Sequence, residues 1–187
     1  MSWSEFLLLG HIVAAIIWLG AGFLMTLVIL GARGRGDRDK ELEEQAGLEW
    51  LAPRLFIPAS LSTLIFGILL VIDGFWTFDQ LWIVIGLVGW AVSFVLGFFY
   101  FKPEGERIGA IVEERGPRDP ELDRRLLTVS TVDRVQATIL FLVVADMVIK
   151  PTGEDTGVLI AGAAIVAAAV VAAALAIRGG ATSPAQS

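Results

Sequence analysis

The residue of this chain best suited to chemistry is its one histidine, His11, which lies inside the apolar run from Phe6 to Leu30. An imidazole nitrogen can bind a metal or exchange protons near neutral pH. An ionisable side chain within a long apolar segment is costly and usually has a function. The chain has no cysteine and only three methionines to share such work. His11 is therefore the first candidate for a metal ligand and for a catalytic residue.

Small residues and a tryptophan share a face with His11 if the run is helical. The spacing puts these residues on one stripe: His11, Ala14, Ala15, Trp18 and Gly22. This His11 stripe leaves a slot beside the imidazole, which favours a bound cofactor. The alternative is structural, because small residues also let a neighbouring helix come close enough for the histidine to hydrogen-bond across the interface. The sequence leaves both interpretations open.

The elements that must position His11 are membrane helices. The chain has 187 residues, 56% of them hydrophobic, which is typical of a polytopic membrane protein and not of a water-soluble domain. We predict a single all-α membrane domain, a helical bundle with a four-helix core and a fifth, Ala-rich span. The predicted spans are 6–30, 55–75, 81–101, 129–149 and 158–177, followed by a disordered tail, 179–187. The expected surroundings are a lipid bilayer, and nothing in the sequence supports nucleic-acid binding.

Local signals refine these boundaries. Glu41–Leu51 reads as a short helix in the first polar connection, and Lys102-Pro103 is expected to stop the third span. Asp119-Pro120 reads as an N-cap followed by proline, and the helix that begins there can run to Lys150. The last span is built from Ala, Val, Ile and Gly, so we interpret it as a packing or dimerisation helix that contacts a second copy or another membrane subunit.

The basic residues predict the orientation of the bundle. They gather in the first and third connections and are absent from the N-terminus and from the connection between the second and third spans. The positive-inside rule then puts the N-terminus outside and the C-terminus in the cytoplasm. We expect a multi-pass protein of the cell membrane. Lys150 is the exception to the charge pattern, because this orientation puts it on the outer side.

This orientation brings further polar residues to the outer end of the bundle with His11. Asp73, Asp146 and Lys150 end or nearly end their spans on that side. A carboxylate on one imidazole nitrogen would fix the tautomer and leave the other nitrogen for a metal, and Asp146 and Lys150 are four apart on one helix and can pair. We therefore predict His11, Asp146 and Lys150 as catalytic residues. The alternative is that Lys150 extends to the surface and Asp73 caps a turn.

The chain resembles a group of bacterial membrane proteins. The lone histidine followed by Trp18-x-Gly20, with a later span that ends in Asp146-Met147-Val148-Ile149-Lys150-Pro151, is similar to membrane protoporphyrinogen oxidases, copper-resistance D membrane domains and related uncharacterised integral membrane proteins. The resemblance implies a self-associating four-helix core whose first-span histidine ligates haem or engages porphyrin. It also implies a bacterial inner or plasma membrane. The chain departs from the oxidase pattern near Gln80, where that group has a lysine.

Two functions follow as expectations. In the first, the chain binds haem b or a porphyrin through His11 and has a redox or porphyrin-handling role, with Met147, Lys150, water or a second subunit's His11 as the other axial ligand. An oxidoreductase of the protoporphyrinogen-oxidase type is then possible, although the lysine is missing. In the second, the chain is a non-catalytic subunit or scaffold that associates through its small-residue helix faces. A transporter ranks third, because the sequence has no evident inverted repeat.

Overall fold

The computed structural model describes residues 1–74 and 76–181, and regular structure in this part of the chain is helical throughout. The helices run in the order α1 (Trp3–Gly34), α2 (Arg38–Leu51), α3 (Ile57–Asp73), α4 (Leu81–Leu96), α5 (Lys102–Arg115), α6 (Pro120–Ile149) and α7 (Thr156–Ala181). Two π-helical turns, η1 (Ala52–Phe56) and η2 (Gly97–Phe101), precede α3 and α5. The predicted all-α class is confirmed.

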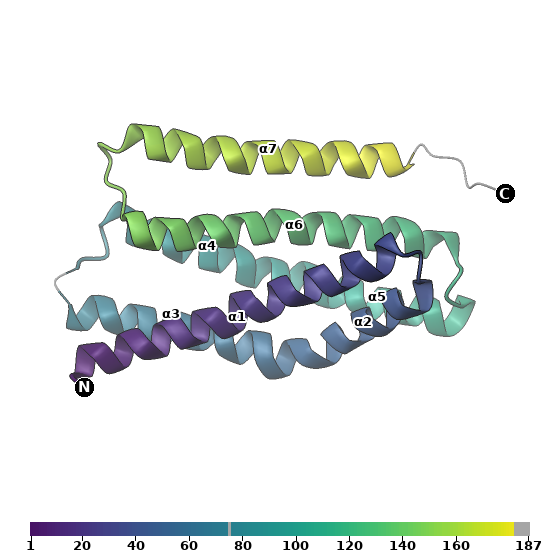
Figure 1. The fold of residues 1–187 in the computed structure, drawn as a ribbon, viewed down its shortest axis with the longest axis horizontal. Coiled ribbons are helices and arrows are strands. Elements are labelled where there is room, and N and C mark those ends of the chain that lie inside the picture. The colour runs from purple at the N-terminus through teal and green to yellow at the C-terminus, as the bar shows by residue number, and fades with distance from the viewer. Residues whose placement is uncertain (75, 182–187) are drawn as a thin grey trace.

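Four helical stretches are long and apolar enough to cross a membrane: Trp3–Val28, Arg54–Asp73, Leu81–Arg115 and Thr156–Gly179. The prediction of a polytopic membrane bundle is thereby confirmed. Helix α6 carries the predicted span 129–149, and Asp133, Arg134 and Asp146 interrupt its apolar part. Its crossing of the membrane stays a prediction, although α6 lies lengthwise beside α1, α4 and α7 (Figure 1).

The bundle is built from helix pairs that run in opposite directions. Helix α1 packs along α3, and α6 packs on α4, α1 and α7 (Figure 1). The Phe23 ring of α1 meets the Phe141 ring of α6 edge-on, with centroids 5.5 Å apart. Helix α7 packs mainly on α6, and none of its candidate span is buried, so most of its Ala- and Val-rich surface faces outward. The arrangement is the expected four-helix core with an additional Ala-rich helix.

The third span does not stop at Lys102-Pro103 as predicted, because the helical chain continues from α4 through η2 into α5. In the π-helical turn the Lys102 N–H reaches back to the Gly97 carbonyl. Pro103 then falls in the first turn of α5, where its missing N–H removes no required hydrogen bond. The π-helical turn thus lets the proline sit within a long helix.

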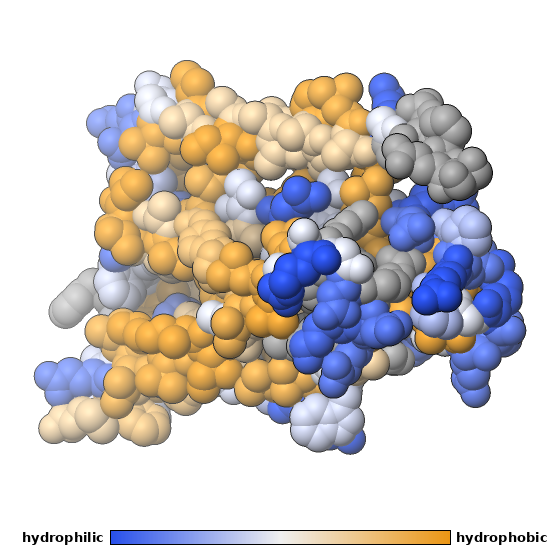
Figure 2. All heavy atoms as spheres, turned by 45° about the vertical axis from the view of Figure 1, so that its right-hand side comes forward, coloured by the Kyte–Doolittle hydropathy of each residue, from blue (hydrophilic) through white to orange (hydrophobic). Residues whose placement is uncertain are grey.

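Helices α2 and α5 and the start of α6 form a polar cap at one end of the bundle, where hydrophilic side chains gather (Figure 2). Its small core consists of Ile108, Ile111, Leu122 and Leu126, and Leu42 of α2 packs against it. The predicted helix Glu41–Leu51 is confirmed within α2, and its Leu42 faces this core.

Both predicted ends of α6 are confirmed. The Asp119 side chain accepts the Glu121 N–H at 2.8 Å, Pro120 opens the helix, and Lys150 ends it in a left-handed conformation with φ 51°. A carboxylate N-cap and a proline in the first turn explain this start. At the other end of the chain, the tail predicted from Gly179 is helical to Ala181, and its remainder lies outside the described residues.

Candidate functional site

The His11 imidazole lies in the interface between α1 and α3. Its Nδ1 is 2.9 Å from the Thr63 carbonyl oxygen, and because a carbonyl can only accept, Nδ1 carries the proton of this hydrogen bond. The ring also lies against Gly67, where an added Cβ would be 3.1 Å from His11 Cε1 and 3.3 Å from Nδ1. Glycine at position 67 therefore gives the ring its place on α3. With the proton on Nδ1, the neutral ring has its free lone pair on Nε2.

Helix α3 accepts a second ring N–H, from its other neighbour α4. Trp90 Nε1 of α4 donates to the Ser60 carbonyl at 3.0 Å. The hydroxyls of α3 bond within the helix, as Thr63 Oγ1 does to the Ala59 carbonyl at 2.9 Å. Helix α3 thus offers main-chain carbonyls to donors on both of its neighbours, as membrane helices rich in small and hydroxyl residues can do.

The remaining residues of the His11 stripe face the interior of the bundle. Ala14 is 7% exposed, and Ala15, Trp18 and Gly22 are half-buried. A Cβ added at Gly22 would meet the Phe56 ring at 3.6 Å, so this part of the stripe also packs close to the start of α3. The stripe provides a close helix contact, as the structural interpretation requires. The contacts that orient the His11 ring come from Thr63 and Gly67 of α3.

Asp146 is buried on the side of α6 that packs on α4, and the expected contact with His11 is not formed. Its side chain is 7% exposed, and within the described chain neither carboxylate oxygen has a hydrogen-bond partner. The neighbouring Val143 and Met147 lie against Gly89 and Gly86 of α4. Asp146 thus belongs to the α4–α6 interface, whereas His11 uses a carbonyl of α3. The prediction that Asp146 fixes the His11 tautomer is wrong because the Thr63 carbonyl does so.

Lys150 does not pair with Asp146 either. Its Nζ donates to the Met147 carbonyl at 2.8 Å and lies 5.3 Å from the centroid of the Trp82 ring. The left-handed conformation of Lys150 takes its side chain off the helical spacing of four that the predicted ion pair assumed. Lys150 therefore covers Trp82, at the start of α4, in a cation–π contact.

Asp73, the last residue of α3, accepts a hydrogen bond from Ser4 Oγ at 2.5 Å. The structure brings His11, Asp73, Asp146 and Lys150 to the end of the bundle where α3 and α6 finish, as predicted from the topology. It gives each of them a separate environment. Roles in catalysis for His11, Asp146 and Lys150 stay predictions.

The described residues contain no group of three or more His, Cys, Asp or Glu side chains that could hold a metal ion. His11 is thus a single ligand with a single main-chain partner. Met147, one of the predicted alternatives for the other axial ligand, packs with its Sδ and Cε atoms toward Gly86 in the α4–α6 interface.

The partners of His11 were not predicted from the sequence. Thr63 and Gly67 are four residues apart, so they share a face of α3, and a small residue one turn beyond a polar one was the available signal. A second unpredicted contact joins α1 and α6, where Thr26 Oγ1 donates to Asp133 at 2.6 Å.

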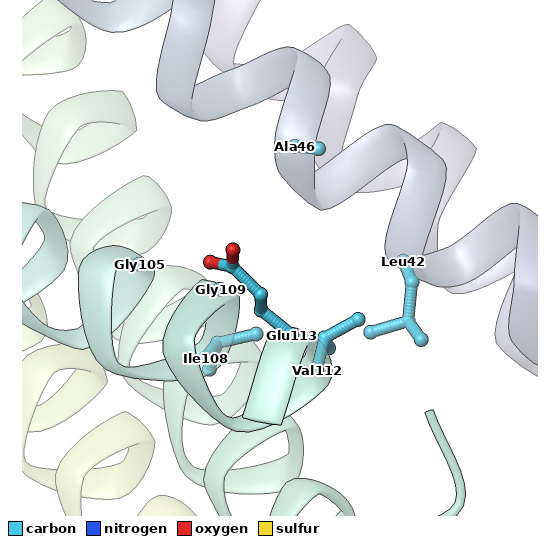
Figure 3. Close-up of a pocket in the computed structure, with 7 residues that line it drawn as sticks. All are labelled: Leu42, Ala46, Gly105, Ile108, Gly109, Val112 and Glu113. Carbon is cyan, nitrogen blue, oxygen red and sulfur yellow. The ribbon is translucent and has the colours of Figure 1, made fainter. Parts of the chain in front are cut away.

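A hollow of ≈ 170 Å³ lies in the polar cap between α2 and α5, away from His11 (Figure 3). Its lining is mostly apolar, and Glu113 is the ionisable member: Leu42, Ala46, Gly105, Ile108, Gly109, Val112 and Glu113. Figure 3 shows the Glu113 carboxylate projecting into the space between the two helices. One carboxylate among apolar residues provides no reactive arrangement.

The chain was compared with known protein families. The model of a family described as "Predicted integral membrane protein (DUF2269)" matches residues 5–151, from the first turn of α1 to just beyond the end of α6. No curated protein and no solved structure matches the chain. The match agrees with the expected resemblance to integral membrane proteins, and its description names neither protoporphyrinogen oxidase nor copper-resistance D.

Proposed function

Because the chain belongs to the DUF2269 family of integral membrane proteins, we propose that it works within the bilayer as a haem-binding protein, with His11 as the iron ligand. The observation that supports this most is the hydrogen bond of Nδ1 to the Thr63 carbonyl at 2.9 Å. Histidines that bind metals usually give their other ring N–H to a carbonyl or carboxylate, which fixes the tautomer and the ring plane. His11 has this arrangement without any cofactor.

The ligand set favours haem over a bare metal ion. The iron of haem is already held by the porphyrin, so the protein need supply only one or two axial ligands. His11 can supply one. The group of three or more ligands that a bare ion needs is not found among the described residues. When bound, haem b would supply one-electron exchange, and a redox or porphyrin-handling role follows from it.

The chain's own residues would set the position and the surroundings of the ligand. Gly67 and Thr63 hold the imidazole in place. Ala14 and Ala15 have small side chains, so they would leave room for the cofactor beside the ring. Asp146 is a buried carboxylate with no partner in the described chain, and it is the candidate for proton exchange within the bundle. The expected location, a bacterial plasma or inner membrane, rests on the resemblance alone.

The test is an absorption spectrum of the full chain, purified in detergent after expression with added haem. We expect a Soret band from the wild-type chain and its loss or shift in His11→Ala. Val143→Ala is the control, because Val143 packs against Gly89 in the α4–α6 interface and carries no ligand atom, so this change should leave the band unchanged. Absence of the band, or an unchanged band in His11→Ala, would contradict the proposal.

The second candidate is a non-catalytic subunit, and the outer surface of α7 favours it. None of the α7 span is buried, and Gly157 and Gly162 have no atoms within 4 Å of an added Cβ apart from α7 itself. Small residues on an exposed membrane helix allow close approach of another helix, in a homodimer or with another membrane subunit. Gly162→Leu should then weaken association in cross-linking of membranes, whereas Gly97→Leu, at another open position, should not.

A further inference from the structure

A second hollow, of ≈ 250 Å³, lies where η2 and α5, the start of α6 and the end of α7 meet. Six residues line it: Tyr100, Glu104, Arg124, Arg125, Thr128 and Ile177. They come from segments far apart in the sequence. The hollow therefore exists only in the folded chain and lies apart from the His11 site.

Around this hollow, Arg125 forms ion pairs with described carboxylates and Arg124 does not. Glu104 accepts from Arg107 at 2.6 Å and from Arg125 at 2.8 Å, and Arg125 also bridges to Glu121 at 2.7 Å. The Arg124 guanidinium has no ion pair or hydrogen bond with any described residue, and only its main-chain carbonyl is used, by Thr128 Oγ1 at 2.8 Å. The wall of the hollow thus contains the Arg124 guanidinium, which no described residue pairs, beside the ion pairs of Glu104 and Arg125.

The hollow lies near the end of the α7 candidate span, at the point where the helical stretch from α4 to α5 becomes charged. Ile177 is near the end of the α7 span, and Tyr100 lies in η2, just before the charged helix α5. Phe98 and Phe99, which precede Tyr100 in η2, are 46% and 69% exposed. The polar cap begins here, and the distribution of basic residues assigns this end to the cytoplasm.

We propose that this hollow binds the phosphate group of an anionic phospholipid from the cytoplasmic leaflet. Arg124 donates to the phosphate oxygens, for which the planar guanidinium fork is well suited. The acyl chains lie along the outward apolar surface of α7 beside Ile177. Basic pockets between membrane helices on the cytoplasmic side bind anionic headgroups in this way, because that leaflet carries the negative lipids.

The apolar side of the hollow favours a lipid phosphate over a free phosphate ion. Ile177 belongs to a helix whose span has no buried residue, so its neighbours outside the chain are acyl chains. A free ion gains nothing from such a surface, whereas a lipid fills it with its chains. Arg178, the next residue, adds a second cation at the same end of α7.

Native mass spectrometry of the full chain in detergent tests this proposal. The protein is titrated with phosphatidylglycerol and, separately, with phosphatidylcholine of the same acyl chains. We expect tighter binding of one phosphatidylglycerol, and a loss of about tenfold or more in its affinity in Arg124→Gln, because charge-assisted hydrogen bonds are the strong ones. Arg124→Lys should be intermediate, since it keeps the charge and loses the fork.

Arg118→Gln is the matched control, because it makes the same charge change at an exposed position outside the hollow. It should retain the affinity for phosphatidylglycerol, and circular dichroism should show equal helix content for all variants. The proposal would be overturned if the wild-type chain bound the two lipids with equal affinity, or if Arg124→Gln kept the wild-type affinity for phosphatidylglycerol. It would also be overturned if Arg118→Gln lost as much of this affinity as Arg124→Gln. Displacement of the lipid by inorganic phosphate at equal concentration would also overturn it and assign the site to the free ion. None of these measurements uses haem.

Discussion

Replacing Gly67 by alanine tests whether helix α3 fixes the His11 ring. The added Cβ would be 3.1 Å from His11 Cε1 and 3.3 Å from Nδ1, closer than most real contacts of a Cβ. The ring cannot simply retreat, because Nδ1 is bonded to the Thr63 carbonyl one turn before Gly67. Gly67→Ala must therefore shift the ring and lengthen or break this hydrogen bond.

The size of the effect follows from three contributions. Overpacking costs about 1 to 3 kcal/mol. A hydrogen bond between membrane helices is worth about 0.6 kcal/mol on average and about 1.7 at most. Alanine recovers about 1 kcal/mol of helix propensity over glycine. We expect Gly67→Ala to lower the free energy of unfolding by about 1 to 3 kcal/mol in the wild-type chain. In a His11→Ala background the same change should raise it by up to about 1 kcal/mol.

A double-mutant cycle measures this change of sign. The four chains are unfolded from mild detergent with sodium dodecyl sulfate and followed by circular dichroism, which gives the coupling between positions 11 and 67. Gly20→Ala is the control on α1, because no atom lies within 4 Å of its added Cβ. It should have the same effect with and without His11. An equal effect of Gly67→Ala in both backgrounds would refute the fixed position of the ring and weaken the support for a ligand role.

Three further predictions concern the rest of the bundle. With no native cysteine, Gly153→Cys should react with an impermeant thiol reagent added outside the cell and Arg118→Cys should not; the reverse would invert the orientation. The hydrogen bond from Arg115 is the main cause that lowers the pKa of Glu121 below its ordinary value of 4.5. The charged carboxylate therefore stabilises the polar cap fully above pH 4.5, and this stabilisation is lost as the pH falls through the lowered pKa of the folded chain. The melting temperature of Glu121→Gln should lie below that of the wild-type chain at pH 7 and approach it as the pH falls below 4.5; a constant difference would contradict the pairing. Asp146→Asn should raise the free energy of unfolding in the detergent assay by at most about 3 kcal/mol, because it removes a buried charge that has no partner among the described residues, and a decrease would contradict this cost of the charge.

Much of the fold could be predicted from the sequence because its signals are local. Long apolar runs, the Asp119-Pro120 cap and the Ala-rich final span each depend on neighbouring residues alone. They gave the helical class, the ends of α6 and the outward helix α7. The local rule failed at Pro103, where a π-helical turn changed the hydrogen-bond register and let the helix continue.

The candidate site depended on contacts between distant helices. The sequence alone determined that His11 is the one imidazole, that it lies in a membrane helix and that a stripe of small residues surrounds it. The tertiary structure decided its partner, a carbonyl 52 residues away on α3, and separated Asp146 and Lys150 from it. Hydropathy and capping fix where a helix begins and ends, but the rotation and register of two packed helices are set by the shapes of the side chains between them. At this site the deciding shape is the missing side chain of Gly67, which lets the His11 ring reach the Thr63 carbonyl.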